Sequence, residues 1–78
     1  MNAQQELQYS CTAQWLPDED GGIRKAWCLN VTDANGLLLR AVDDVCGSES
    51  RAGALEALLT RNQVSPVHIL DVLEDWLA

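Results

Sequence analysis

Residues 23–32 read IRKAWCLNVT, and this stretch decides the fold. Trp27, Leu29 and Val31 alternate along it with smaller or polar side chains, which predicts a β-strand with one buried face. The segments 18–21 (DEDG) and 33–36 (DANG) flank it. An Asp followed three residues later by Gly is typical of a type I turn whose Gly takes a positive φ, closing a three-residue hairpin loop. The stretch is therefore predicted to be the middle strand of a three-stranded antiparallel meander.

The preceding strand is predicted at residues 7–16, where apolar and polar side chains alternate again. With a three-residue loop at the first turn, Tyr9 lies opposite Val31, and the apolar faces of the two strands coincide. We expect the helices to cover this face, which carries Tyr9, Trp15, Trp27 and Leu29. Cys11 and Cys28 fall on opposite faces in this register, which argues against a disulfide between them.

The third strand is predicted to follow a second three-residue loop at residues 34–36, with Leu39 opposite Val31. This register assigns Leu37, Leu39 and Ala41 to the core face and Leu38, Arg40, Val42 and Asp44 to the other face. A two-residue turn at residues 35–36 is the alternative. Because that turn would set Arg40 against Val31 in the core, the longer loop is preferred.

Two helices are predicted after the strands. Ser48 or Ser50 can serve as the N-cap of a helix at residues 51–61. Its apolar side is formed by Ala52, Leu55, Leu58 and Leu59. Gly53 weakens this helix, so we expect it to mark close packing against a neighbour. A second helix is predicted at residues 67–77 behind a Ser-Pro pair, and its apolar stripe is wider than one small sheet needs.

These elements predict an α+β fold in the order β-β-β-α-α, a three-stranded antiparallel meander followed by two helices packed on one face. We expect a single domain over residues 1–78, with residues 1–6 frayed at the start. The order of a meander followed by a helix is similar to that of HicB-type antitoxins, whose fold is a degenerate ribonuclease-H-like one. The similarity lies in element order alone.

Charge is the unusual bulk property of the chain. Twelve acidic residues stand against five basic ones, for a formal net charge of −7 and a pI near 4.2. Direct binding to nucleic acid or to an anionic membrane needs a basic surface, so we expect neither. No apolar run approaches the ~20 residues of a membrane helix, and the start MNAQQELQ lacks a secretion signal, so a cytoplasmic protein is expected. Solubility alone is the competing explanation of the acidity.

No residue pattern in the chain predicts catalysis, a cofactor or a metal site. Asp43 and Asp44 could hold a divalent cation, but successive strand residues point to opposite faces. Cys46 and the single histidine, His68, would form a dyad only if they met in space, and no third residue orients them. Three tryptophans could line an aromatic pocket, but ordinary core packing explains Trp15, Trp27 and Trp76.

The sequence therefore favours a small acidic, non-catalytic protein-binding module. A more specific hypothesis is an inhibitor or adaptor of a basic nucleic-acid-handling protein, by analogy with compact acidic phage counter-defence proteins. The alternative is a homodimeric antitoxin-like or regulatory module whose last helix or edge strand makes the dimer. The residues expected to bind a partner are Asp18, Glu19, Asp20, Asp33, Asp43, Asp44, Arg24, Arg40, Leu38 and Trp76.

Overall fold

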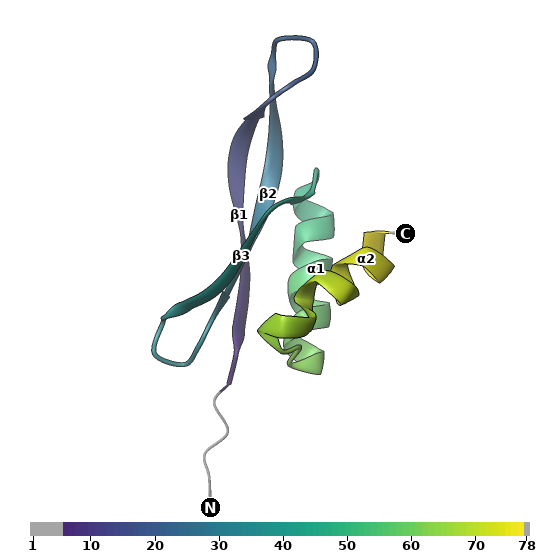
Figure 1. Ribbon diagram of the computed structural model, residues 1–78. Helices are drawn as coiled ribbons and strands as arrows, with labels where there is room; N and C mark the ends of the chain where they lie inside the picture. The colour runs from purple at the N-terminus through teal and green to yellow at the C-terminus, as the bar shows by residue number, and fades with distance from the viewer. Residues whose placement is uncertain (1–5, 78) are drawn as a thin grey trace, which may run out of the picture.

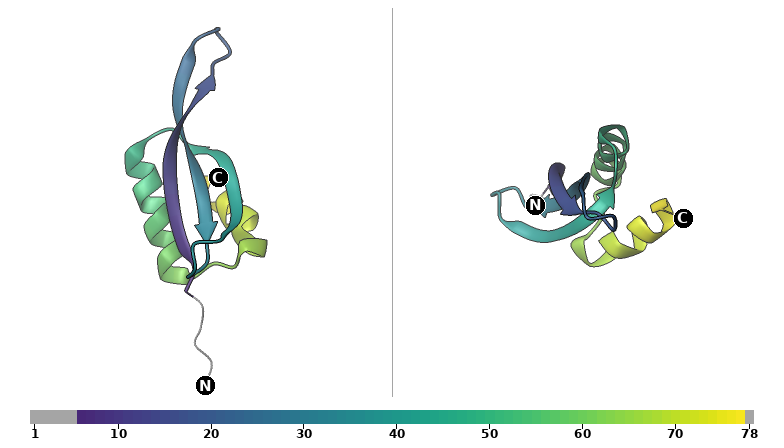
Figure 2. Two further views of the ribbon diagram at one scale, coloured as in Figure 1. Left: turned by 90° about the vertical axis from the view of Figure 1, so that its left-hand side faces the viewer. Right: turned by 90° about the horizontal axis from the view of Figure 1, so that it is seen from above.

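The meander and the two helices are present in the predicted order (Figure 1). A computed structural model describes residues 6–77. The strands β1 (Gln8–Pro17), β2 (Ile23–Thr32) and β3 (Leu38–Cys46) form one antiparallel sheet in the order β1-β2-β3. The helices α1 (Glu49–Asn62) and α2 (Ile69–Leu77) cover one face of it, and a short 3-10 turn, η1 (Pro66–His68), leads into α2 (Figure 2). The frayed start expected at residues 1–6 falls, except for Glu6, outside the described residues.

The first hairpin has the predicted loop and register. The backbone N–H of Asp18 donates to the Gly22 carbonyl at 2.8 Å, and that of Gly21 donates to the Asp18 carbonyl at 3.0 Å. Gly21 has a φ of 87°, as a turn residue without a Cβ can. Tyr9 pairs with Val31, as predicted. The cysteines Cys11, Cys28 and Cys46 are all free thiols.

The second hairpin has the predicted loop but a different register. The Asp33 N–H donates to the Leu37 carbonyl, and Gly36 has a φ of 85°. The pairing then shifts, because Thr32 lies opposite Leu38 while Val31 lies opposite Arg40. One residue of β3 has no counterpart on β2, which makes a bulge and reverses the alternation beyond it. The assignment of Leu37, Leu39 and Ala41 to the core is therefore wrong, and all three are exposed.

A second irregularity in β3 brings apolar residues to the helix side. Leu29 lies opposite Val42, and Trp27 lies opposite Cys46. Between these two pairs β3 therefore has two more residues than β2. Val42 therefore packs against the core instead of facing away, and Val45 is 3% exposed. The two irregularities together place Val42 and Val45 against the helices, and the burial of these apolar side chains accounts for the departure from strict alternation.

The core lies between the lower part of the sheet and the helices. It consists of Tyr9, Trp27, Leu29, Val31, Val45, Ala52, Leu55, Leu59, Ile69 and Leu73. The distal part of the β1–β2 hairpin, residues 13–25, projects beyond both helices as an arm (Figure 1), and the molecule measures 55 × 26 × 20 Å. Trp15 lies on this arm and is 66% exposed, so its assignment to the core is wrong. The strand pattern placed Trp15 on the face of the sheet that the helices cover, but the helices do not extend as far as Trp15.

The helix ends follow local chemistry. The Ser48 side chain accepts a hydrogen bond from the Arg51 N–H and caps α1 at its start. At the other end Gln63 takes the left-handed conformation, with φ 45° and ψ 56°. Gly53 is exposed and has no atom within 4 Å of where a Cβ would stand, so the expected close packing at Gly53 is absent. The second helix begins as the 3-10 turn η1, without a side-chain cap from Ser65.

Side chains of the first helix and its cap close part of the free edge of the sheet. The Cys11 N–H on β1 donates to the Glu56 carboxylate. Gln63 accepts from the Leu7 N–H at 2.8 Å and donates to the Leu7 carbonyl at 3.1 Å, as a neighbouring strand would. These contacts occupy backbone groups that point away from β2 and could otherwise pair with another chain.

Candidate functional site

An apolar groove lies between the end of β3 and α2. Its volume is about 350 Å³. It is lined by Val42, Asp43, Asp44, Val45, Leu70, Leu73, Glu74 and Leu77. Val45 and Leu73 form the buried floor, whereas Leu70 and Leu77 are 51% and 54% exposed. We call these eight residues the β3–α2 groove.

Three carboxylates line the β3–α2 groove, and among the described residues only Asp44 has a balancing cation. Asp43 and Glu74 lie in its lining, and neither forms an ion pair within residues 6–77. The last turn of α2 carries no basic residue. Acidic side chains near the negative end of a helix dipole are locally unfavourable, so Glu74 and Asp75 weaken α2 where they stand. The β3–α2 groove therefore combines apolar walls with carboxylates.

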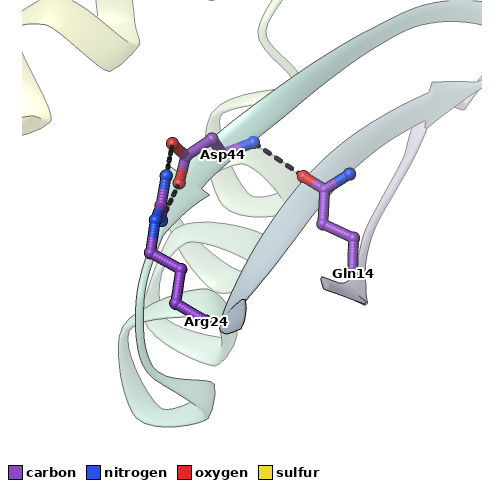
Figure 3. A network of polar contacts seen from close by, with 3 residues as sticks. All are labelled: Gln14, Arg24 and Asp44. Carbon is purple, nitrogen blue, oxygen red and sulfur yellow. Dashed lines mark hydrogen bonds and ion pairs between the residues drawn. The ribbon is translucent and has the colours of Figure 1, made fainter. Parts of the chain in front are cut away.

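Asp44 belongs to a polar network that fixes the end of β3 against the arm (Figure 3). The Arg24 guanidinium donates to both Asp44 carboxylate oxygens, at 3.0 and 2.6 Å. The Asp44 backbone N–H donates to Gln14 Oε1 at 2.9 Å. The paired guanidinium holds the pKa of Asp44 below its usual range. The ion pair between Arg24 and Asp44 therefore holds the part of β3 that lines the groove in place.

The remaining acidic candidates are separated by the length of β2. Asp18, Glu19 and Asp20 form the tip of the arm. Asp33 lies at the opposite end, where its carboxylate accepts from the N–H groups of Asn35 and Leu37 and holds the turn. Asp33 and Asp44 therefore do not share a patch, since Asp44 pairs with Arg24 near the start of β2.

The other three candidates have separate positions. Leu38 is 54% exposed and lies opposite Thr32 on the face away from the helices. Arg40 lies opposite Val31, the placement that the longer loop was expected to avoid, and its Nε is buried without a hydrogen-bond partner. Trp76 packs against the core, and the Arg51 guanidinium stands 4.6 Å from its ring centre.

The groups considered for catalysis or metal binding are dispersed. The Cys46 thiol lies 3.5 Å from the Ser48 carbonyl, while His68 has Asp71 as its neighbour at 4.0 Å. Burial raises the pKa of the Cys11 thiol to about 12, with the Glu56 carboxylate adding to the effect. Among residues 6–77 no three His, Cys, Asp or Glu side chains come together in a way that could hold a metal ion.

The three tryptophans do not share a pocket. Trp27 is in the core, Trp76 packs beside it from α2, and Trp15 stands out on the arm. The Lys25 ammonium lies between the rings of Trp15 and Trp27, 5.7 and 5.1 Å from their centres. This cation–π contact stabilises the exposed arm.

A family model describes residues 22–78. It covers β2, β3, both helices and therefore the whole β3–α2 groove. The chain belongs to the family of unknown function DUF6514. No curated protein and no solved structure matches the chain significantly.

Sequence reasoning placed Asp43 and Asp44 among the binding residues but missed the groove's other lining residues. Leu70, Glu74 and Leu77 are the most accessible of these. Two signals pointed to them: the apolar stripe of residues 67–77 is too wide for a small sheet, and its carboxylates oppose the helix dipole. The opposite wall was hidden, because Val42 and Val45 reach the helix side only through the irregularities of β3.

Proposed function

We propose that this protein is a non-catalytic protein-binding module and that the β3–α2 groove is its binding site. The observation that carries the proposal is the groove itself, in which half-exposed Leu70 and Leu77 stand beside the unpaired carboxylate of Glu74. Buried apolar contacts supply most of the binding free energy in such sites, and surrounding charges supply attraction and orientation. The net charge of −7 favours a basic partner.

In a narrower form of the proposal, the partner is a basic nucleic-acid-handling protein, and this chain acts as its inhibitor or adaptor. Its support is electrostatic, because carboxylates can occupy basic sites that are built for phosphates. A cytoplasmic location fits the three free thiols, which persist in a reducing compartment. Within residues 6–77 no helix has the length and apolar character needed to cross a membrane.

A second candidate function is a homodimeric regulatory module. Val67, Leu70 and Leu77 are each more than half exposed, which is the apolar excess on which this alternative depends. Two chains of charge −7 repel each other, so the basic partner is the leading proposal. Light scattering at high micromolar concentration distinguishes the two, because a monomer has a mass of 8.6 kDa and a dimer twice that mass.

Affinity capture from a lysate of the source organism tests the leading proposal. The bait is the wild-type chain, compared with Glu74→Lys in the groove and with Glu19→Lys at the arm tip as a charge-matched control. We expect a basic protein to be retained by the wild type and by Glu19→Lys. It should be lost from Glu74→Lys and weakened by raising the salt concentration, because screening shortens the range of the attraction.

Two results would contradict the proposal. One is a partner retained equally by both variants, which would place the binding site elsewhere on the molecule. The other is a wild-type bait that retains nothing beyond a second copy of itself at low salt, which would favour the homodimer.

A further inference from the structure

We infer that the β3–α2 groove receives an amphipathic basic α-helix of its partner, about two turns long, which packs along α2. This inference rests on the proposed protein-binding function and names the form of the bound segment. It follows from the spacing of the leucines on α2, the backbone of β3, and the charges around the groove.

Leu70 and Leu77 on α2 expose an apolar surface on which a helix can pack, with the buried Leu73 between them. Leu70, Leu73 and Leu77 are spaced i, i+3, i+7, so they form one stripe along the helix. The stripe is about 10 Å long at ~1.5 Å per residue. A helix that packs on it needs apolar residues of the same spacing over two turns, and its neighbouring side chains would extend over Val42 and Val45 on the opposite wall.

The backbone of β3 argues against an added strand. A partner strand needs an edge whose N–H and C=O groups point outward at regular intervals. In β3 the pairing shifts between Val31 and Thr32 and again between Trp27 and Leu29, and Asp44 has a φ of 58°. These irregularities break the outward row of donors and acceptors along the wall of the groove. A helix satisfies its own backbone and requires no such row.

Charge selects the side chains that flank the apolar stripe of the partner helix. Asp71, Glu74 and Asp75 are exposed on α2. Lysine or arginine beside the partner's leucines would compensate these carboxylates and the negative end of the α2 dipole. A second copy of this chain cannot supply such a segment, because each of its helices carries at least as many acidic as basic residues.

A designed peptide tests this inference directly. The probe is an N-acetylated 15-residue peptide with leucine at positions i, i+3 and i+7, lysine beside them and alanine elsewhere. Its control is a scrambled peptide of identical composition that has no apolar stripe. The full-length protein, labelled with ¹⁵N, is titrated with each peptide, and the ¹³Cα shifts of a labelled peptide report its bound conformation.

We expect the striped peptide to shift the amides of Val42, Val45, Leu70 and Leu77 and to bind as a helix. Leu70→Ser should weaken binding about tenfold, because a leucine side chain loses its apolar contact. Leu37→Ser, the same change at a leucine that is 63% exposed near the β2–β3 turn, should change the affinity less than twofold. Glu74→Lys should weaken binding more than Glu19→Lys.

Three results would overturn the inference. They are equal binding of the scrambled peptide, an extended bound conformation along β3, and the absence of amide shifts at the groove. The proposed function is judged separately. If a lysate partner is lost from Glu74→Lys while the peptide does not bind, the groove is a protein-binding site and only its helical occupant is rejected.

Discussion

At the scale of single residues, Asp44 links the backbone of β3 to the arm. Its φ of 58° is unusual for a residue with a Cβ, and Asp is one of the few types that adopt this conformation readily. The same residue pairs with Arg24 through its carboxylate and with Gln14 through its N–H. One wall of the β3–α2 groove therefore depends on the backbone conformation of one residue and on two partners.

Substitution of Asp44 should separate the backbone effect from the charge effect. Asp44→Asn keeps a side chain that tolerates the left-handed conformation, so only the exposed ion pair is lost and the stability change should be small. Asp44→Ala should cost about 1 kcal/mol more, because alanine lacks that tolerance. Urea unfolding of the two variants measures the difference. Equal stabilities would show that the left-handed backbone is not a constraint at this position.

The Cys11 thiol should make stability fall at alkaline pH. Its pKa is raised by burial from 9.0 to about 12 in the folded protein. Below pH 9 the thiol is protonated in both states and contributes nothing to the pH dependence. Between about pH 9 and 12 the unfolded chain loses the proton while the folded chain keeps it, which favours unfolding.

Thermal unfolding of the wild type and Cys11→Ala from pH 8 to 11 measures this effect. The midpoint of the wild type should fall further than that of the variant as the pH rises, by a few degrees. Tyr9, whose pKa is also raised by burial, contributes in the same direction in both proteins and cancels in the comparison. Parallel pH profiles would show that the Cys11 thiol ionises equally in the folded and unfolded chains.

At the scale of secondary-structure elements, the first hairpin could be predicted from the sequence in full and the second only in part. Both loops follow from an Asp and a Gly three residues apart, which are chemical signals that can be read locally. The register of β3 could not be read, because a bulge shifts the alternation by one and the run Leu37-Leu38-Leu39 carries no period of two. What decides it is the burial of Val42 and Val45 against the helices, a tertiary effect.

The groove shares this limit. Its α2 wall was visible in the sequence as an apolar stripe too wide for the sheet, while its β3 wall exists only after two irregularities in pairing. Trp15 on the arm shows the same limit of prediction from the sequence. Alternation assigned it to the correct face, but the reach of the helices, which leaves the arm uncovered, is set by the whole fold.

The edge of β1 gives a prediction about an element. Glu56 accepts from the Cys11 N–H and so covers part of the strand that could pair with another chain. Glu56→Ala should cost about 1 kcal/mol and increase self-association, whereas Glu56→Gln keeps an acceptor and should do neither. Urea unfolding and light scattering provide the two measurements. A stable, monomeric Glu56→Ala would mean that this contact does not protect the edge.

At the scale of the whole molecule, carboxylates and exposed apolar side chains lie together both on the arm and in the β3–α2 groove. The arm carries Asp18, Glu19 and Asp20 at its tip, while the β3–α2 groove combines carboxylates with exposed leucines. The arm tip exposes Ile23 beside its carboxylates, whose field is screened beyond about 8 Å at physiological salt. The β3–α2 groove differs from the arm because it is concave, so a partner can bury apolar side chains there.

Site-specific cross-linking tests most directly whether the β3–α2 groove binds a basic partner. Benzoylphenylalanine is placed at position 70 in the groove or at position 37 beside the β2–β3 turn, two exposed leucine positions that differ in location. Irradiation in a lysate of the source organism should join position 70 to a basic protein and leave position 37 unjoined, and Glu74→Lys should remove the adduct. Equal adducts from both positions, or an adduct of position 70 with a second copy of the chain alone, would show that the β3–α2 groove does not bind a basic partner.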